Sequence, residues 1–316
     1  MQIVFNKKFV KQYNKSPQKI QKAFDKRLKI FIKNPIDHRL NNHPLGGKYQ
    51  DKSSINITGD WRAVFEKFDG YCIEFFSLEL IVSYMVKKTN KILPSHIAFI
   101  VDGNRRWAQK RGLPAGAGHM EATNKTIETL IFHSIKLGIP YLTFWAFSTE
   151  NWKRGQRFAG MLFKILETKM TKGVEKYNKA GIRLRLIGDI SKLPAKLTKT
   201  LQKWEKDSAA NSKITVIIAL NYGGRDELLR AIKRVIETPG VEDLKKTLEQ
   251  NLDTVGIPDP DLIIRTGGEK RLSGFLPWQS IYSELYFTDT LFPDFTPQRL
   301  DEALLDYQNR QRRFGK

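Results

Sequence analysis

The chain has 316 residues, of which 41% are hydrophobic, and its formal net charge is +21. It is long enough for one large and one small domain. No apolar run approaches the roughly 18 to 20 residues that span a bilayer, and the first residues lack an apolar core, so we expect neither a membrane-spanning helix nor a signal peptide. Because Cys72 is the only cysteine, an intrachain disulfide or a cysteine-based zinc site is excluded. We therefore expect a cytoplasmic globular protein with anionic partners, which could be nucleic acid, an acidic membrane surface or phosphorylated substrates.

Residues 1–90 carry 17 Lys and Arg against 8 Asp and Glu, a net charge of +9, and are more basic per residue than the remainder.

Two helix-like stretches are predicted within residues 1–34. Ser16 can cap the second of them, Pro17 fits its first turn, and Pro35 ends it. Three short strands are predicted next, at 54–58, 61–67 and 71–78. Two helices followed by three short strands indicate a helix hairpin and then an antiparallel meander.

That layout, with LGGKY at 45–49 and TGDWRAVFE at 58–66, resembles the RelE/ParE toxin superfamily over residues 1–85. The family commonly ends with a Gly-Thr-His or similar segment before a Tyr, whereas residues 77–84 here read SLELIVSY and lack the histidine that would serve in RNA cleavage. Arg62 matches the family's strand arginine, which could bind a phosphate, although a surface cross-strand charge is the favoured interpretation. We expect a small α+β toxin-like module over residues 1–86 that does not cleave RNA.

A polar linker is predicted at 87–95 and a second domain at 96–316. Apolar segments alternate with helical patterns through this domain. Strands are predicted at 97–101, 141–147, 182–187, 214–220 and 262–265, with helices near 119–137, 158–179, 194–208 and 225–237 and a last helix starting at 296–297. This alternation predicts an α/β fold with a mainly parallel sheet covered by helices.

The segment HIAFIVDGNRRW at 96–107 reads as a buried strand that ends at an Asp-Gly turn. A carboxylate at the carboxyl end of a parallel strand lies at the edge where ligands bind. Gly103 allows backbone N–H groups to approach a ligand, and Arg105 and Arg106 add donors suited to phosphate. Asp102 would repel an anion unless a divalent cation such as Mg²⁺ lay between them. The segment therefore suggests a metal-diphosphate site, the alternative being an ordinary Asp-Gly turn before a solvated basic helix.

Polar loops follow three further strands: STENWKR at 148–154, NYGGR at 221–225 and RTGGEKRLS at 265–273. Because parallel strands bring their carboxyl ends to one edge, side chains distant in the sequence can converge there. We expect convergence of Asp102, Asn151, Arg154, Arg265 and Arg271.

These segments, together with Gly-His at 118–119, IRTGGEKRLSGFLPWQ at 264–279 and SELYFTD at 283–289, resemble the undecaprenyl diphosphate synthase family of cis-prenyltransferases over residues 95–316. The resemblance implies an Mg²⁺-dependent transferase that adds isopentenyl diphosphate units in cis to an allylic diphosphate, often farnesyl diphosphate. The product would be a polyprenyl diphosphate, a precursor of a carrier lipid.

The resemblance also implies the site residues. Asp102 would be the essential Mg²⁺-binding carboxylate and Glu284 the second one. The allylic diphosphate site would comprise Gly103, Asn104, Arg105, Arg106, Trp107 and His119, and the mobile loop Ser148, Thr149, Glu150, Trp152 and Arg154. The isopentenyl diphosphate clamp would comprise Arg265, Arg271, Leu272 and Ser273. Asn151 matches the position to which proton removal is assigned. Because neutral Asn is a poor base, we interpret it as orienting the substrate or a phosphate oxygen that accepts the proton.

Several of these residues have structural alternatives: His119 could cap a helix, and Trp107 and Trp152 could be core aromatics. The family resemblance further implies a homodimer, because RRFG at 312–315 resembles a terminal Arg-x-Gly element that reaches the partner's active site. Peripheral contact with a membrane is compatible with the basic N-terminal region. The competing hypotheses are an RNA- or ribosome-binding toxin-like protein with a degenerate prenyltransferase domain, and a non-catalytic accessory subunit. The complete motif set between residues 102 and 284 favours the enzyme.

Overall fold

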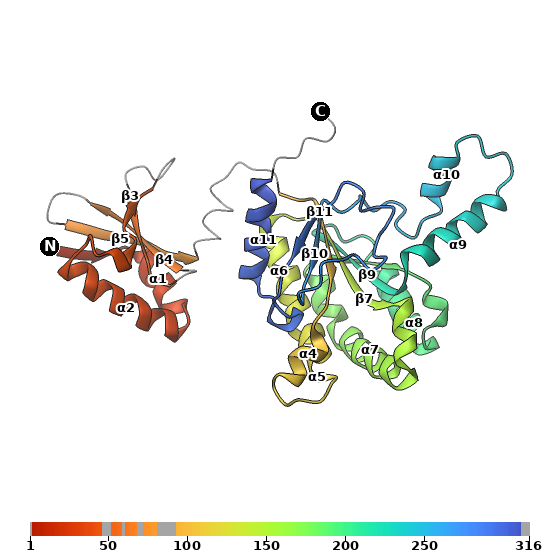
Figure 1. Ribbon diagram of the computed structural model, residues 1–316, viewed down its shortest axis with the longest axis horizontal. Helices are drawn as coiled ribbons and strands as arrows, with labels where there is room; N and C mark the ends of the chain where they lie inside the picture. The colour runs from red at the N-terminus through yellow and green to blue at the C-terminus, as the bar shows by residue number, and fades with distance from the viewer. Residues whose placement is uncertain (1, 46–51, 59–60, 68–71, 81–92, 311–316) are drawn as a thin grey trace. The chain divides into compact units, whose positions relative to one another are not determined.

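The computed structural model describes residues 2–45, 52–58, 61–67, 72–80 and 93–310 (Figure 1). The chain divides into two compact units, Met1–Lys91 and Ile92–Lys316. Several sequence predictions lie outside the described residues: most of LGGKY, the turns at 59–60 and 69–70, most of the linker at 87–95, and the Arg-x-Gly element at 312–315.

In the N-terminal unit, two helices and a five-stranded sheet share one core. The strand order is β1-β5-β4-β3-β2. The elements are β1 (Gln2–Phe5), α1 (Lys7–Lys15), α2 (Gln18–Lys33), η1 (His38–Leu40), β2 (His43–Pro44), β3 (Lys52–Asn56), β4 (Trp61–Lys67) and β5 (Cys72–Leu80). The predicted antiparallel meander is present as β3, β4 and β5. Phe9 of α1 and Phe24 and Phe31 of α2 pack with Phe65 and Phe75 of the sheet.

Strand β1 was not predicted, because residues 1–34 were interpreted only as two helix-like stretches. It pairs in parallel with β5, from Gln2 opposite Cys72 to Phe5 opposite Phe75. Residues 3–5 are Ile, Val and Phe, which favour strands, although a run this short gives no periodic signal. The Asn6 side chain then accepts a hydrogen bond from the Lys8 N–H and caps α1. The helix-hairpin prediction is therefore corrected to a strand followed by two helices.

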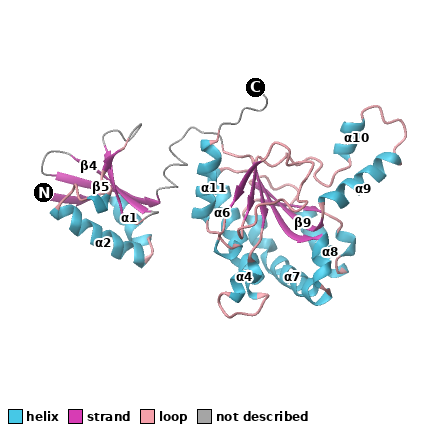
Figure 2. Ribbon diagram, in the orientation of Figure 1, coloured by secondary structure: helices cyan, strands magenta, loops and turns pink. Residues whose placement is uncertain are grey.

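The C-terminal unit contains a six-stranded parallel sheet in the order β11-β10-β6-β7-β9-β8. Helices surround this sheet (Figure 2), as expected for the predicted α/β fold. Its strands are β6 (His96–Ile100), β7 (Tyr141–Ser148), β8 (Ile182–Ile187), β9 (Ile214–Tyr222), β10 (Leu262–Arg265) and β11 (Glu284–Phe287). Its helices are α4 (Asn104–Gln109), α5 (Ala117–Glu121), α6 (Ile127–Leu137), α7 (Gln156–Lys179), α8 (Ala195–Asp207), α9 (Gly224–Ile236), α10 (Leu244–Gln250) and α11 (Pro297–Asn309), with short turns η3 (Ala122–Thr126), η4 (Thr149–Arg154), η5 (Ile190–Lys192) and η6 (Phe292–Asp294).

Three features of this unit differ from the sequence prediction. The helix expected near 119–137 is divided into α5, a π-helical turn and α6. Helix α10 and strand β11 were not predicted. Strand β11 has only four residues, Glu-Leu-Tyr-Phe, and all four are half-buried, so it is not the fully buried strand that a continuous apolar run indicates. Across the described residues, we find no helix that combines the length and apolar character needed to cross a bilayer.

His96, at the start of β6, makes the stability of this unit depend on pH. Its ring is buried, with Nδ1 2.6 Å from the Pro258 carbonyl oxygen and Nε2 2.7 Å from Thr143 Oγ1. Burial lowers the pKa of His96 to about 4, so the folded protein holds a neutral ring that donates to Pro258 and accepts from Thr143. The unfolded chain takes up a proton near pH 6.5, so stability decreases as the pH falls below that value.

We expect this histidine to lower the free energy of unfolding by about 2 kcal/mol between pH 7 and pH 5. Urea denaturation at the two pH values measures the change. His96→Gln should be less stable at pH 7 but should lose less stability on acidification. His38→Gln is the control, since the His38 side chain is 93% exposed. An equal loss on acidification in the wild type and His96→Gln would contradict this assignment.

Candidate active site

Asp102 and the loop after β10 meet at the carboxyl edge of the parallel sheet. Strands β6 and β10 are neighbours, with Ile100 opposite Arg265. The Asp102 N–H donates to Thr266 Oγ1 at 3.1 Å, and that hydroxyl donates to the Asp102 carbonyl oxygen at 2.8 Å. The Thr266 hydroxyl thereby joins the two strand ends through the backbone N–H and carbonyl of Asp102, which fixes the position of Asp102.

The Asp102 carboxylate lies between two guanidinium groups. Arg265 Nη2 is 3.0 Å from Oδ2, and Arg106 Nη2 is 3.4 Å from Oδ1. Oδ1 also accepts the Gly103 N–H at 2.6 Å. The Asp102 side chain is 33% exposed, whereas that of Arg265 is only 6% exposed. The site therefore presents an accessible carboxylate flanked by fixed positive charge, an arrangement suited to a cation and an anion bound together.

Two glycines allow the backbone to pack closely around this carboxylate. Gly103 precedes α4 with φ +101°, a conformation that a side chain would strain. A Cβ at Gly118 would lie 2.0 Å from the Asn104 carbonyl oxygen, so only glycine allows α5 to approach α4 this closely. The Asn104 side chain is buried and donates to the Val101 carbonyl oxygen at 2.8 Å. Asn104 therefore anchors the turn that follows β6.

The remaining residues of the predicted allylic site differ in their surroundings. Arg105 is exposed. Trp107 Nε1 donates to Asp294 Oδ1 at 2.7 Å, and the Arg111 guanidinium stacks 4.3 Å from the Trp107 ring centroid. Trp107 thus joins α4 to η6. His119 is mostly buried, and its ring centroid lies 5.7 Å from that of Phe158. Burial lowers the pKa of His119 to about 4, so its ring is neutral near pH 7 and adds no positive charge.

The predicted mobile loop is held to the end of β9 by hydrogen bonds. Asn151 Oδ1 accepts the Ser148 N–H at 3.1 Å, and the Ser148 side chain accepts the Asn151 N–H. Trp152 Nε1 donates to Asn221 Oδ1 at 2.7 Å. Thr149 packs against Gly223, where a Cβ would lie 2.4 Å from the threonine hydroxyl. Asn151 is therefore a capping residue of this loop.

Two charged residues of the loop face solvent. Glu150 and Arg154 are both exposed, and the Arg154 guanidinium lies 5.3 Å from the Phe158 ring centroid. Phe158 is also the neighbour of His119. Arg154 is thereby placed on the same side of α7 as His119.

The predicted clamp is organised by Arg265. Its Nη1 donates to Ser273 Oγ at 2.9 Å and to the Arg271 carbonyl oxygen, while Nη2 holds Asp102. The Arg271 side chain is 61% exposed and pairs with Glu269 at 2.5 Å. Leu272 packs against the apolar cluster that includes Phe275. Arg265 therefore links the carboxylate to the loop, while Arg271 remains accessible to a ligand.

Within one chain, Glu284 lies at the opposite edge of the sheet from Asp102. It begins β11, level with Leu262 and Ile97 at the amino edge of the sheet. Three residues of strand, about 10 Å, separate this level from that of Ile100. Glu284 Oε2 instead pairs with Arg310 Nη1 at 2.6 Å. The assignment of Glu284 as the second Mg²⁺-binding carboxylate stays a prediction, and within one chain β11 does not place this residue at the level of Asp102.

Two site residues were not singled out from the sequence. Thr266 links its hydroxyl to the backbone of Asp102. The sequence indicated this role only by placing Thr266 directly after Arg265. Asn221 is 1% exposed, has φ +47°, receives the Trp152 indole N–H and donates to the Asp189 carbonyl oxygen at 2.8 Å. The sequence indicated this role only by placing an Asn, a residue that tolerates positive φ, before Tyr-Gly-Gly at the end of a strand.

The comparisons with known proteins concern the C-terminal unit. A family model described as "Putative undecaprenyl diphosphate synthase" matches residues 100–315. The isoprenyl transferase of Aquifex aeolicus (strain VF5) is 46% identical, with the match covering 71% of this chain and 96% of that protein. A chloroplastic (2Z,6Z)-farnesyl diphosphate synthase of Solanum lycopersicum is 43% identical, with 72% of this chain and 81% of that protein covered.

Similar solved structures include those of two diphosphate synthases. Lavandulyl diphosphate synthase from Lavandula x intermedia, in complex with dimethylallyl diphosphate, has a TM-score of 0.68 and 36% identity, covering 71% of this chain and 99% of that one. A probable undecaprenyl diphosphate synthase from Campylobacter jejuni has a TM-score of 0.61 and 37% identity, with the same two coverages.

The sheet, the arginine-flanked carboxylate and these matches define a prenyltransferase. The chain belongs to the undecaprenyl diphosphate synthase family of cis-prenyltransferases, and residues 100–315 carry the family match. The RelE/ParE resemblance of residues 1–85, and with it any contact with RNA or the ribosome, stays a prediction.

Proposed function

We propose that this protein is a cytoplasmic enzyme that condenses isopentenyl diphosphate in cis with an allylic diphosphate, and that this allylic substrate is farnesyl diphosphate. The product is a polyprenyl diphosphate that serves as a carrier-lipid precursor. The observation that carries the proposal is the accessible Asp102 carboxylate between Arg265 and Arg106, at the carboxyl edge of a parallel sheet. The family membership supports the reaction class.

Asp102 fits a role in holding Mg²⁺. This ion keeps several water molecules and binds through one or two carboxylates together with substrate phosphates. The residues that the structure describes contain no cluster of three or more His, Cys, Asp or Glu side chains able to hold a metal, so a diphosphate would supply further oxygens beside Asp102. When bound, Mg²⁺ would neutralise negative charge on the diphosphate.

The side chains of this chain would then act as follows. As the allylic C–O bond breaks, negative charge develops on the departing diphosphate, and Arg106 stabilises it, while Arg265 links Asp102 to the isopentenyl diphosphate clamp. A new C–C bond forms to isopentenyl diphosphate, which loses a proton to a phosphate oxygen. Asn151 does not act as a base, because its amide is neutral and already caps the loop through Ser148. It positions the loop beside the reacting groups.

A homodimer is part of the proposal. Helix α9 exposes an apolar stripe, in which Leu229 is 68%, Ile232 44% and Ile236 79% exposed. Their spacing of three and four residues places them on one face of the helix. A second copy of the chain covering this stripe would remove large aliphatic side chains from water, which is a favourable contribution to association.

The proposal is tested by incubating the purified full chain with farnesyl diphosphate, labelled isopentenyl diphosphate and Mg²⁺, and separating the products by chromatography. We expect a ladder of elongated cis products that needs all three components. A single addition, or elongation only from dimethylallyl diphosphate, would overturn the farnesyl and carrier-lipid parts. No condensation with either primer would overturn the activity.

Arg271→Ala is expected to raise KM for isopentenyl diphosphate more than KM for the allylic substrate. The Arg271 side chain is exposed and pairs only with Glu269 among the described residues. Losing one arginine–phosphate contact costs roughly 1.5 to 3 kcal/mol, or about ten- to hundredfold in KM. Steady-state kinetics with each substrate varied in turn measure the two constants. Equal increases would contradict the division into two sites.

A further inference from the structure

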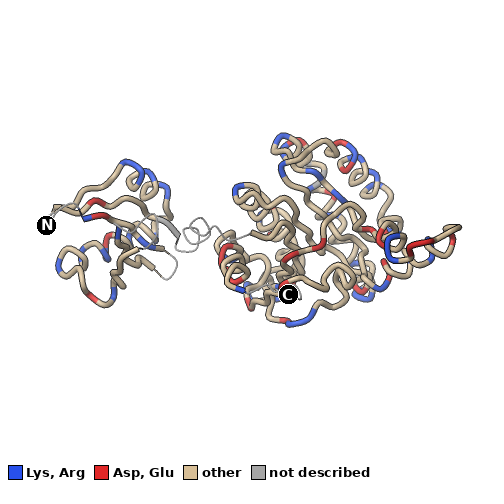
Figure 3. The backbone as a smooth tube through the Cα atoms, turned by 90° about the horizontal axis from the view of Figure 1, so that it is seen from above, with Lys and Arg blue, Asp and Glu red and all other residues tan. Residues whose placement is uncertain are grey.

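The positive charge of the N-terminal unit is concentrated on its two helices. Residues 7–33, which span α1 and α2, hold nine Lys and one Arg against one Asp, a net charge of +9. Residues 34–85, which follow α2 in the sequence, hold five basic and seven acidic residues, a net charge of −2. Figure 3 marks the Lys and Arg positions in blue along the backbone. The basic character therefore belongs to the two helices, not to the segment that follows them in the sequence.

Five lysines of α2 share one face: Lys19, Lys22, Lys26, Lys29 and Lys33, hereafter the lysine face. Their spacing of three, four, three and four residues aligns them along the helix. All five are exposed, whereas the core residues Ile20, Phe24 and Phe31 lie on the other side of α2. At 1.5 Å per residue the lysine face extends for about 21 Å.

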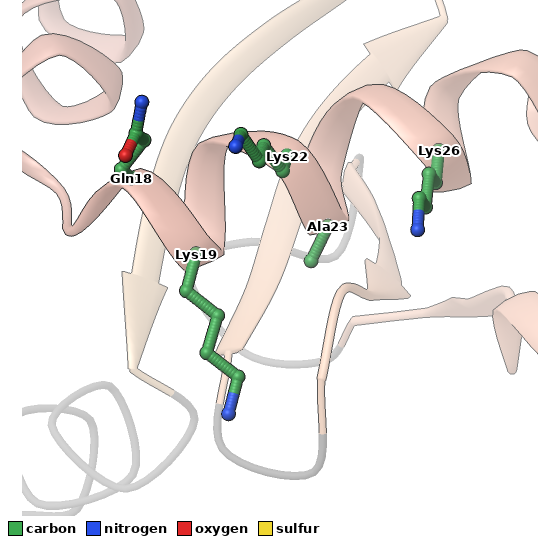
Figure 4. Close-up of a pocket in the computed structure, with 5 residues that line it drawn as sticks. All are labelled: Gln18, Lys19, Lys22, Ala23 and Lys26. Atoms are coloured by element: carbon green, nitrogen blue, oxygen red, sulfur yellow. The ribbon is translucent and has the colours of Figure 1, made fainter.

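The first turns of the lysine face border a shallow hollow. It is lined by Gln18, Lys19, Lys22, Ala23 and Lys26. In Figure 4 the side chains of Lys19, Ala23 and Lys26 point to the same side of α2, so the small alanine leaves space between longer basic side chains. Such a hollow can admit a phosphate group between ammonium groups.

The lysines are not neutralised by described residues of the unit. Among the described residues, none of the five forms an ion pair. The one acidic residue of α2, Asp25, accepts a hydrogen bond from the Tyr13 hydroxyl at 2.9 Å. Like charges three and four residues apart on a helix repel one another. An anionic surface laid against this face would relieve that repulsion.

Exposed aliphatic side chains lie at the end of the lysine face. Ile32 is 53% exposed, and Ile36, just after the helix, is 87% exposed. The aromatic residues of α2, Phe24 and Phe31, are buried and cannot stack on nucleic-acid bases. Lysines beside exposed aliphatic groups match a lipid interface, where phosphates lie next to acyl chains.

We propose that the N-terminal unit docks this protein on an anionic lipid surface through the lysine face, with Ile32 and Ile36 entering the interface. The phosphates of the lipid headgroups are the groups that the lysines recognise. Docking requires no prenyl substrate, so vesicle binding is tested independently of the proposed reaction. It would hold the prenyltransferase unit close to the membrane that receives a long hydrocarbon product.

The test is sedimentation of the full chain with phosphatidylcholine vesicles, with and without phosphatidylglycerol. We expect binding only to the anionic vesicles and weaker binding as salt is raised. The triple variant Lys19→Gln, Lys22→Gln, Lys26→Gln should bind about a hundredfold more weakly, because each lysine near an anionic leaflet contributes roughly a factor of five. The matched control is Lys136→Gln, Lys199→Gln, Lys206→Gln, which removes three exposed charges from α6 and α8 and should bind as the wild type does.

A second variant separates lipid from nucleic acid. Ile36→Ser should weaken vesicle binding several-fold without altering the circular dichroism spectrum, whereas a phosphate-only contact would not respond to it. The proposal is overturned if the triple variant binds anionic vesicles like the wild type. It is also overturned if the lysine face is needed for binding mixed-sequence RNA but not for binding vesicles, which would favour an RNA partner.

Discussion

Asp102→Ala is expected to lower kcat for prenyl transfer by at least a hundredfold. The carboxylate holds Arg265 at 3.0 Å and Arg106 at 3.4 Å, and it is the residue proposed to hold Mg²⁺ beside the diphosphate. Its removal takes away an electrostatic stabiliser of the departing diphosphate, a loss of about 3 kcal/mol or more. Steady-state assays with labelled isopentenyl diphosphate at saturating Mg²⁺ measure the effect.

Two further variants separate charge from structure. Asp102→Asn keeps an oxygen that can accept the Gly103 N–H but removes the charge, so we expect a loss almost as large as that of alanine. Asp207→Ala is the matched control: this carboxylate is 38% exposed, pairs with Lys203, and lies on α8. It should leave turnover unchanged. Near-normal turnover by Asp102→Ala would contradict the assignment of this residue.

Much of the C-terminal fold could be predicted because its strands are continuous apolar runs between helical patterns. Five predicted strands correspond to β6 to β10 within a few residues. Strand β11 could not be found in this way, because its four residues are half-buried and lie in a long irregular segment. Strand β1 was missed for a related reason. Its pairing with β5 joins residues about seventy positions apart, and no local pattern reports such a pairing.

The expected convergence of Asp102 and Arg265 followed from a general rule, since both lie at the carboxyl ends of parallel strands. The structure places Arg265 Nη2, at the end of β10, 3.0 Å from Asp102 Oδ2, just after the adjacent strand β6. The rule could not predict that Trp107 is held by Asp294, which lies 187 positions away. It also gave no register for Glu284, which begins β11 at the other edge. Local sequence thus indicated which residues reach the edge, while long-range pairing decided their partners.

Arg265→Lys is expected to lower kcat/KM for both substrates by roughly 30- to 1000-fold, corresponding to about 2 to 4 kcal/mol for lost charge-assisted hydrogen bonds at a buried site. Lysine keeps the positive charge but has one ammonium group in place of a planar fork. Arg265 uses that fork to contact Asp102 with one nitrogen, and Ser273 Oγ and the Arg271 carbonyl oxygen with the other. A single ammonium group cannot span both sides, so the loop at 271–273 loses its link to the carboxylate.

The predicted pattern distinguishes Arg265 from Arg271. Because Arg265 contacts both Asp102 and the clamp loop, its replacement should affect both substrates, whereas Arg271→Ala should act mainly on isopentenyl diphosphate. Arg230→Lys is the matched control, since Arg230 also bridges two groups, Asp226 at 2.8 Å and Asp253 at 2.6 Å, but lies on α9. It should reduce stability without changing kcat/KM. If Arg265→Lys instead kept wild-type kcat/KM for both substrates while thermal unfolding showed a folded protein, the bridge between carboxylate and clamp would not be required for catalysis.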